Sequence, residues 1–86
     1  MPIISKKLYS RFNIKVELRY NEHNPPHLHI TYKNQRCMLD LDGRYIRGNI
    51  DRDTYKIVYS WIQLHNEEIK SMWMLAYRNL PIGNID

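Results

Sequence analysis

The chain has 86 residues, of which 43% are hydrophobic and 26% are charged, and its formal net charge is +4. This length suits one domain rather than two, and the composition excludes a disordered chain. The apolar runs are too short to span a bilayer and the first residues lack the layout of a signal peptide, so we expect a cytoplasmic protein with no membrane partner. The single cysteine, Cys37, excludes an internal disulfide and is expected to be a buried small hydrophobe.

The first half of the chain is predicted to form strands, after an N-terminal lead-in that covers residues 1–13. Apolar and charged residues alternate over residues 14–20, which indicates a strand with one buried face. Residues 21–26 are expected to form a turn, because two prolines remove backbone hydrogen-bond donors there. A second alternation covers residues 27–32 and a third covers residues 36–42.

A fourth strand is predicted over residues 45–50. Asp42 and Gly43 form the tight turn that precedes it, because glycine readily accepts a positive φ. Gly48 is expected to form a bulge within this strand. Residues 14–50 are therefore predicted to make an antiparallel sheet of about four strands.

The period of the apolar residues changes after the fourth strand. Apolar residues then recur at steps of three or four, which predicts one long helix over residues 52–78. Asp51 or Asp53 is expected to cap this helix, and residues 79–86 are expected to form a tail. A long C-terminal helix packed on one face of an antiparallel sheet gives a single α+β domain over residues 1–86.

Three histidines, His23, His27 and His29, lie within seven residues. His27 and His29 are two residues apart on a predicted strand, so their side chains leave from one face, away from the predicted helix. His23 lies across a turn that Pro25 and Pro26 stiffen, which can fold it back beside the other two. Imidazole titrates near neutral pH, so such a cluster suits proton transfer, phosphate binding or metal ligation.

Three hypotheses for this segment stay open. In the first, His27 and His29 act as acid and base on a phosphodiester, with His23 as a third member. In the second, the three histidines ligate a metal such as zinc or iron, and Asp40 and Asp42 on the next strand complete the site; no other cofactor is expected. In the third, the histidines are structural and the two prolines of the turn bind a partner.

His65 is the strongly polar residue on the apolar stripe of the predicted helix. We expect it to be a core residue hydrogen-bonded to a carbonyl group. Its position on the helix places it on the opposite side of the sheet from His27 and His29, so it is not expected in their site. Trp61 and Trp73, on the same stripe, are expected to be large core anchors.

Basic and aromatic residues gather around the second predicted hairpin. Arg44, Arg47 and Arg52 lie there in the sequence, close to Tyr45 and Tyr55. Such a mixture can hold RNA through phosphate contacts and base stacking. The basic residues are otherwise spread along the chain, so charge alone does not identify a nucleic-acid-binding protein.

Several segments together resemble the Domain of Unknown Function 4160 family. They are Met1–Ser5, Phe12, residues 21–29, Asp42–Gly43 with Gly48, residues 61–69 and Trp73. The resemblance spans almost the whole chain, although the link from Lys6 to Arg11 is longer than in the family. The motif positions that it carries over are His23, Pro25, Pro26, His27, His29, Trp61, His65, Glu68 and Trp73. The resemblance implies a small bacterial or phage-borne protein, often described as a toxin–antitoxin component beside a small partner protein.

The leading hypothesis is therefore a toxin-like component of a bacterial toxin–antitoxin or defence locus that acts as a metal-independent ribonuclease. His27 and His29 would be its acid–base pair, and Arg44 or Arg47 would steady the phosphate charge. The alternatives are a non-catalytic module that binds protein or nucleic acid, and a small metal-binding protein. The expected protein partner is a small antitoxin-like protein or a second copy of the chain.

Overall fold

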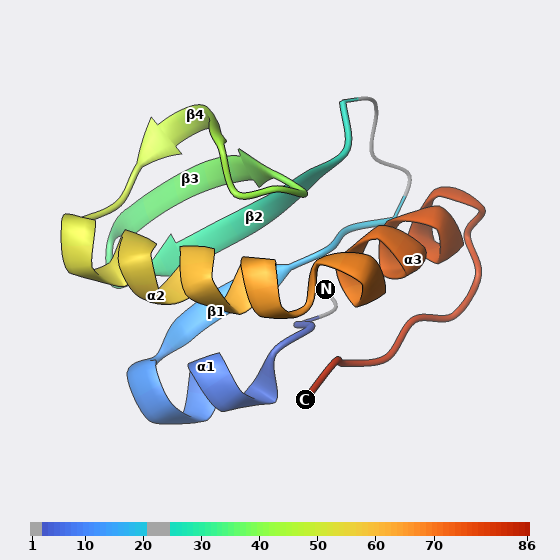
Figure 1. The fold of residues 1–86 in the computed structure, drawn as a ribbon, viewed down its shortest axis with the longest axis horizontal. Helices are drawn as coiled ribbons and strands as arrows, with labels where there is room; N and C mark the ends of the chain where they lie inside the picture. The colour runs from blue at the N-terminus through green and yellow to red at the C-terminus, as the bar shows by residue number, and fades with distance from the viewer. Residues whose placement is uncertain (1–2, 21–24) are drawn as a thin grey trace.

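The computed structural model describes residues 3–20 and 25–86. Its elements are α1 (Lys6–Phe12), β1 (Ile14–Glu17), β2 (His27–Tyr32), β3 (Gln35–Asp40), β4 (Tyr45–Asn49), α2 (Arg52–Leu64) and α3 (Asn66–Tyr77). One helix thus precedes a four-stranded sheet and two helices follow it (Figure 1). The predicted α+β class and antiparallel sheet are confirmed. None of the described helices is long and apolar enough to cross a bilayer.

The sheet is an antiparallel meander with the strand order β1-β2-β3-β4. Val16 pairs with Ile30 and Ile30 pairs with Cys37, so these three buried side chains leave from one face. Helices α2 and α3 pack on that face, where Ile62 and Ile69 are fully buried in the same core cluster (Figure 1). The side chains between these positions point to the opposite side of the sheet, which we call the outer face.

The turn between β3 and β4 is the tight turn expected at Asp42 and Gly43. Gly43 has a φ of 96°, and its amide donates a hydrogen bond to the Asp40 carbonyl over 3.1 Å. The Asp40 amide in turn donates to the Arg44 carbonyl over 2.8 Å. The left-handed conformation at Gly43 is one that a residue without a Cβ adopts at little cost.

The pairing of β3 with β4 contains the expected irregularity, but not at the expected residue. Met38 pairs with Arg47, whereas the residue after Met38 pairs with Tyr45, which leaves Ile46 as the extra residue of the bulge. Gly48, where the bulge was predicted, lies two residues further along and adopts a φ of 76°. The extra residue returns Arg47 to the outer face beside Met38.

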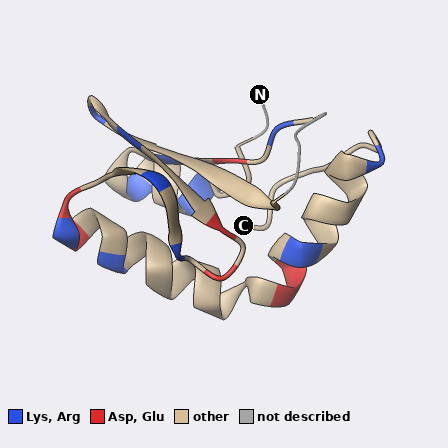
Figure 2. Cartoon of the chain, turned by 90° about the horizontal axis from the view of Figure 1, so that it is seen from above, with Lys and Arg blue, Asp and Glu red and all other residues tan. Residues whose placement is uncertain are grey.

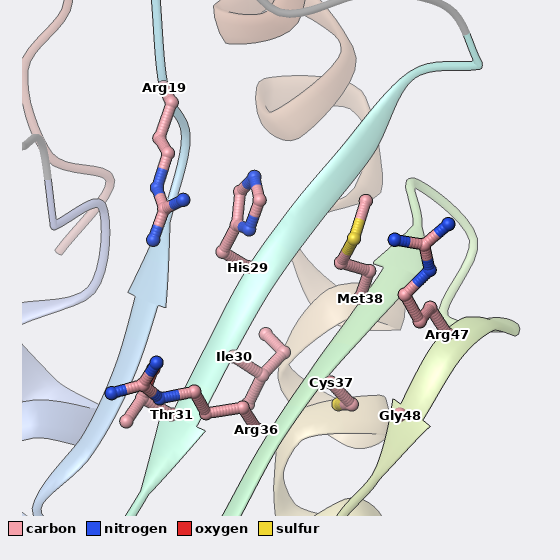
Figure 3. A pocket seen from close by; sticks show the side chains of 9 residues that line it. All are labelled: Arg19, His29, Ile30, Thr31, Arg36, Cys37, Met38, Arg47 and Gly48. Atoms are coloured by element: carbon pink, nitrogen blue, oxygen red, sulfur yellow. The ribbon is translucent and has the colours of Figure 1, made fainter.

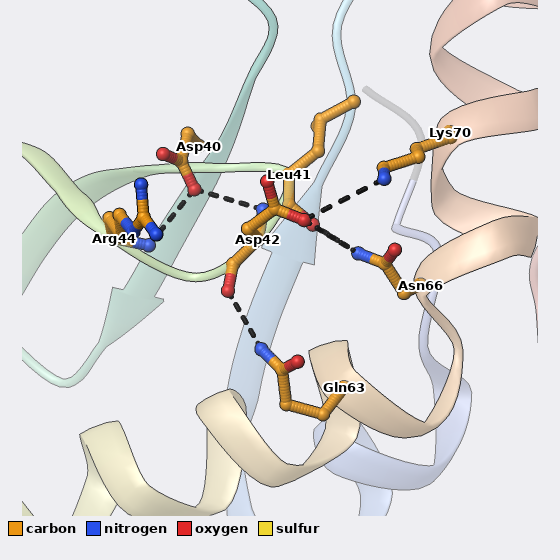
Figure 4. A network of polar contacts seen from close by, with 7 residues as sticks. All are labelled: Asp40, Leu41, Asp42, Arg44, Gln63, Asn66 and Lys70. Carbon is orange, nitrogen blue, oxygen red and sulfur yellow. Dashed lines mark hydrogen bonds and ion pairs between the residues drawn. The ribbon is translucent and has the colours of Figure 1, made fainter.

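The single long helix that we predicted is in fact two helices. They meet at His65, whose φ of −112° and ψ of 23° are not helical. Two side chains that flank this break bind the β3–β4 turn: Gln63 Nε2 donates to the Asp42 carbonyl over 2.7 Å, and Asn66 Nδ2 donates to the Leu41 carbonyl over 2.8 Å (Figure 4). These bonds to the turn hold the chain where its direction changes.

The predicted lead-in contains a further helix, α1, which we did not expect. Ser5 is its N-cap, because the Ser5 hydroxyl accepts a hydrogen bond from the Leu8 amide over 3.1 Å. Asn13 ends the helix in the left-handed conformation, with a φ of 57°. Leu8 is the buried residue through which α1 joins the core.

The tail after α3 returns to α1, so the two described ends of the chain lie near one another (Figure 1). The Ile85 amide donates to the Ile4 carbonyl over 2.7 Å. The Asp86 carboxylate accepts hydrogen bonds from the Trp61 indole over 2.8 Å and from the Ser5 hydroxyl over 3.0 Å. The tail therefore ties α1 to α2.

Candidate functional site

A row of side chains crosses all four strands on the outer face. Glu17 pairs with His29, His29 pairs with Met38, and Met38 pairs with Arg47. Directly opposed residues of antiparallel strands share one face, with their Cβ atoms about 5 Å apart. The row therefore sets a carboxylate beside an imidazole and ends in a guanidinium on the opposite edge strand.

The outer face is hollowed beside His29, Met38 and Arg47 of this row, and the hollow has a volume of about 370 Å³. Glu17 adjoins the hollow through its pairing with His29. Such a volume falls in the range of small-ligand sites, roughly 300–1,000 Å³. Three guanidinium groups line the hollow, those of Arg19, Arg36 and Arg47. His29 lies between Arg19 and Met38 (Figure 3). Guanidinium groups bind phosphate through paired hydrogen bonds, so this arrangement suits a phosphate-bearing ligand.

Glu17 is the residue of this site that sequence analysis missed. It is buried, with 7% exposure, and its Oε1 lies 3.9 Å from Arg19 Nη2. This separation is long for an ion pair, so the contact satisfies the guanidinium only weakly. Within residues 3–20 and 25–86, Arg19 Nε is buried and finds no hydrogen-bond acceptor. Arg19 therefore keeps much of its capacity to attract an anion.

His27 and His29 share a face as predicted, but their surroundings differ. Their ring centroids lie 4.9 Å apart, with the rings inclined at 71°. His27 is 5% exposed, lies 5.8 Å from the Trp73 ring centroid, and bonds the Pro25 carbonyl through Nδ1 over 2.8 Å. Two rings in edge contact leave no room for a phosphate between them, so we assign His29 to the site and a packing role to His27.

The carboxylates of Asp40 and Asp42 hold the β3–β4 turn (Figure 4). Asp40 Oδ1 accepts hydrogen bonds from the amides of Asp42 and Arg44, over 2.9 and 3.0 Å. Asp42 Oδ1 lies 3.2 Å from Asn66 Nδ2 and 3.7 Å from Lys70 Nζ. The Asp40 carboxylate therefore stabilises the turn, and the Asp42 carboxylate joins the turn to α3.

The metal hypothesis needed three histidines. His23 lies outside the described residues, so its place beside the other two stays a prediction for catalysis and for metal binding alike. Among the residues that are described, no three His, Cys, Asp or Glu side chains are grouped so as to hold a metal ion.

The other predicted binding residues lie around the site rather than in it. Pro25 is exposed and Pro26 is half-buried, directly before β2. Arg44 lies in the turn before β4, and Arg52 is the first residue of α2; both are exposed. Basic residues are in fact dispersed over strands and helices (Figure 2), and of the arginines predicted near the second hairpin it is Arg47 that lines the hollow.

His65 does not lie in the core, contrary to our expectation. It is half-buried at the break between α2 and α3, and its Nδ1 lies 3.0 Å from Glu68 Oε1. Its ring centroid is 5.1 Å from that of Trp61, which is a core residue as predicted. The break leaves the imidazole half-buried on the helix side of the sheet, so His65 and Glu68 form a histidine–carboxylate pair remote from the outer face.

The aromatic residues near the second hairpin lie on the helix side. Tyr45 pairs with the core residue Leu39, and its ring stacks on that of Tyr55 with centroids 4.8 Å apart. Burial raises the pKa of both phenols, so they stay protonated at neutral pH. Cys37 is buried as expected, and this burial raises the pKa of its thiol to about 11.

A family model described as "Domain of unknown function (DUF4160)" matches residues 13–74. The chain belongs to this family. The DUF4160 match covers β1 to β4, α2 and most of α3, and so includes the row from Glu17 to Arg47. Helix α1 and the tail with Asp86 lie outside the matched residues. No curated protein and no solved structure matches the chain.

Proposed function

We propose that this DUF4160 protein binds RNA on the outer face of its sheet and cleaves it by general acid–base catalysis. The observation that carries the proposal is the pairing of Glu17 with His29 next to a hollow lined by three guanidinium groups. A base, an acid and a binding site for the phosphate charge are the groups that cleavage of a ribose phosphodiester requires.

In the proposed reaction, Glu17 is the base and His29 is the acid. Glu17 accepts the proton of the ribose 2′-hydroxyl, whose oxygen forms a bond to the adjacent phosphorus. The bond from phosphorus to the 5′-oxygen of the next nucleotide breaks, and protonated His29 donates its proton to that oxygen. The products are a 2′,3′-cyclic phosphate and a free 5′-hydroxyl group, and each catalytic group ends with the opposite protonation state.

The arginines supply the electrostatic part of catalysis. Negative charge grows on the phosphoryl oxygens as the 2′-oxygen attacks, and preorganised cations stabilise it most where water is excluded. Arg19 lies next to Glu17, and Arg47 stands at the other end of the row. Arg36 lines the same hollow from β3, two residues before Met38.

The acid–base pair proposed from the structure replaces the pair predicted from the sequence. Glu17 takes the place of His27, because His27 is buried against Trp73 and bound to the Pro25 carbonyl. Cleavage of cellular RNA is an activity suited to a toxin-like protein, and we keep that biological role as part of the proposal. A small antitoxin-like partner that covers the outer face would then inhibit cleavage.

The proposal is tested with the purified chain and a single-stranded RNA of defined sequence. We expect cleavage to 2′,3′-cyclic phosphate products, and none with DNA of the same sequence, which lacks the attacking hydroxyl. Glu17→Gln and His29→Gln should each lower the cleavage rate by about 100-fold or more, because acid–base groups contribute roughly 10²–10⁴ in rate. The same substitutions should relieve growth arrest if expression of the native chain in bacteria causes it.

The chain provides its own matched control. His65 and Glu68 form a second histidine–carboxylate contact, 3.0 Å long, on the helix side. His65→Gln and Glu68→Gln make the same chemical changes away from the outer face and should leave the cleavage rate within about twofold. An intact RNA after incubation with the native chain, or equal losses in the two pairs of variants, overturns the proposal.

A further inference from the structure

The outer face holds a second hollow, of about 190 Å³, beside the first. Thr31 lines both, so the two hollows meet at the middle of the sheet. The second hollow is also lined by Tyr9, Asn13, Lys15 and Lys33. Thr31 follows His29 by two residues on β2, which is about 7 Å along the strand. The two hollows together are therefore longer than a single bound phosphate group.

The second hollow combines positive charge with an exposed aromatic ring. Lys15 pairs with Thr31 across β1 and β2, and its Nζ lies 5.9 Å from the Tyr9 ring centroid. Lys33 occupies the turn after β2, where it adopts a φ of 55°. Tyr9, on α1, is 42% exposed. The Lys33 Nζ lies 5.2 Å from the Tyr32 ring centroid, at the margin of the same hollow. An exposed ring beside one ammonium group, with a second lysine lining the hollow, offers both a stacking surface and contacts for a phosphate.

Across the sheet, the second hollow continues a row parallel to the catalytic one. Lys15 pairs with Thr31, Thr31 pairs with Arg36, and Arg36 pairs with Asn49. Arg36 lines the first hollow and pairs with Thr31, which lines both hollows. Its positive charge therefore lies close to the place where the two hollows meet. The carboxylate on these two rows is that of Glu17, so cations outnumber anions along the whole track.

We propose that the second hollow is a subsite for the nucleotide next to the cleaved bond, and that the ligand of this face is an extended single strand. The base of that nucleotide stacks on Tyr9, and Lys15 and Lys33 bind its phosphate. A paired base has both faces covered by its neighbours in the duplex, so a stacking ring selects unpaired RNA. This inference rests on the proposed function and adds to it the class of RNA that the site accepts.

Tyr9 lies on α1, the short helix at the N-terminal end of the described residues. Helix α1 lies outside the residues that match the family model, whereas the catalytic row lies inside them. The second subsite therefore combines a family surface, Lys15 and Thr31, with a ring that this chain brings from its own N-terminal helix. Preference for longer single strands would be a property of this chain rather than of the matched region.

The test compares the binding of a mononucleotide, an octanucleotide and a duplex to the Glu17→Gln chain, whose cleavage is expected to be slower by about 100-fold or more. We expect the octanucleotide to bind at least tenfold more tightly than the mononucleotide and the duplex. Tyr9→Ala should weaken octanucleotide binding by about tenfold and leave mononucleotide binding unchanged. Lys15→Ala and Lys33→Ala should each reduce the slope of log affinity against log salt by about 0.7, the loss of one phosphate contact.

Tyr59→Ala is the matched control, because Tyr59 is 43% exposed and belongs to α2, on the helix side of the sheet. It should leave binding of every ligand unchanged. Equal affinities for the mononucleotide and the octanucleotide, a duplex bound as tightly as the single strand, or equal losses for Tyr9→Ala and Tyr59→Ala overturn the second subsite and leave the catalytic row intact. Failure to bind RNA of any length overturns both proposals.

Discussion

The side chains of His27 and His29 leave β2 from the same face, yet their surroundings differ. His27 lies in a closed corner, where Trp73 buries it, whereas His29 lies in the open hollow of the outer face. The pairing of β1 with β2 ends at Glu17 and His29. Beyond this pair, the Trp73 ring from α3 packs against His27, which is 5% exposed. His29, two residues further into the sheet, lies instead in the hollow lined by arginines. The face of a strand is thus set by alternation, whereas the depth of a side chain is set by what packs beside it.

The largest expected effect on folding separates the two histidines. His27→Ala removes a ring that packs against Trp73 and leaves the Pro25 carbonyl without its imidazole donor. We expect the free energy of unfolding to fall by about 3 kcal/mol, from the cavity and the lost hydrogen bond together. Urea denaturation followed by tryptophan fluorescence measures this change.

His29→Ala is the matched substitution in the open region. Because His29 is only half-buried, its removal should change the free energy of unfolding by less than about 1 kcal/mol. Cleavage should respond in the opposite way, with loss in the His29 variant and retention in the folded fraction of the His27 variant. Equal destabilisation by the two substitutions would show that the corner around His27 is not the closed one.

A second, smaller effect is expected at Gly48, on the floor of the open hollow. A Cβ added there would lie 2.4 Å from the Arg36 carbonyl oxygen, and the φ of 76° strains any residue with a side chain. Gly48→Ala should lower the free energy of unfolding by about 2 kcal/mol. It should also weaken RNA binding, because the strand that carries Arg47 must move away from β3.

Gly83→Ala serves as the control for this change, since a Cβ at Gly83 meets no atom within 4 Å. Its effect on unfolding should stay below about 0.5 kcal/mol. If Gly48→Ala were as mild as Gly83→Ala, the close approach of β4 to β3 at the hollow would be wrong.

Alternation, turn residues and capping residues predicted much of the fold. The four strands within residues 14–50, the glycine turn and the cap of α2 at Asp51 all follow from local rules, because each depends on neighbours in the chain. The first strand was predicted to reach residue 20, but β1 ends at Glu17. The break between α2 and α3 at His65 does not follow from local rules. The apolar stripe stays in phase on both sides of it, and the bond that holds Asn66 to Leu41 joins residues 25 positions apart.

Helix α1 was missed for a related reason. Seven residues are too few to form a stable helix alone, so its signals, the Ser5 cap and one buried leucine, are weak in the sequence. Part of its support comes from Asp86, which accepts a hydrogen bond from the Lys7 amide over 3.1 Å. A contact between residues 79 positions apart has no local pattern to reveal it.

The candidate site was predicted in part. Alternation placed His27 and His29 on one face, and their imidazoles suited proton transfer or phosphate binding. Glu17 was overlooked because its neighbour depends on the register of β1 against β2. Register is set by the turn between the strands, and a shift of one residue would have turned Glu17 to the other face. The partner of His29 could therefore be named only once the strands were aligned in space.

Outside the outer face, a smaller effect than that of Gly48→Ala is expected at Asp86, which does not line the first hollow. Partial burial raises the pKa of this carboxyl, but hydrogen bonds from the Trp61 indole, the Lys7 amide and the Ser5 hydroxyl outweigh it and leave the pKa below the usual 3.8. A carboxyl whose pKa is lower in the folded chain stabilises the fold above its unfolded pKa, and this contribution is lost as pH falls through the folded value. After allowance for solvent screening, Asp86→Asn should cost about 1 kcal/mol at neutral pH.

Urea titrations over a pH series test this assignment. The difference in unfolding free energy between the native chain and Asp86→Asn should be constant above about pH 5 and shrink as the pH falls below 3.8. A difference that grew towards acid pH would mean that the fold disfavours the ionised carboxylate of Asp86 and raises its pKa. RNA binding at neutral pH should be the same for both chains, because the tail ties α1 to α2 through Trp61 and does not line the first hollow. A loss of binding in this variant would instead show that the tail controls the outer face through α1.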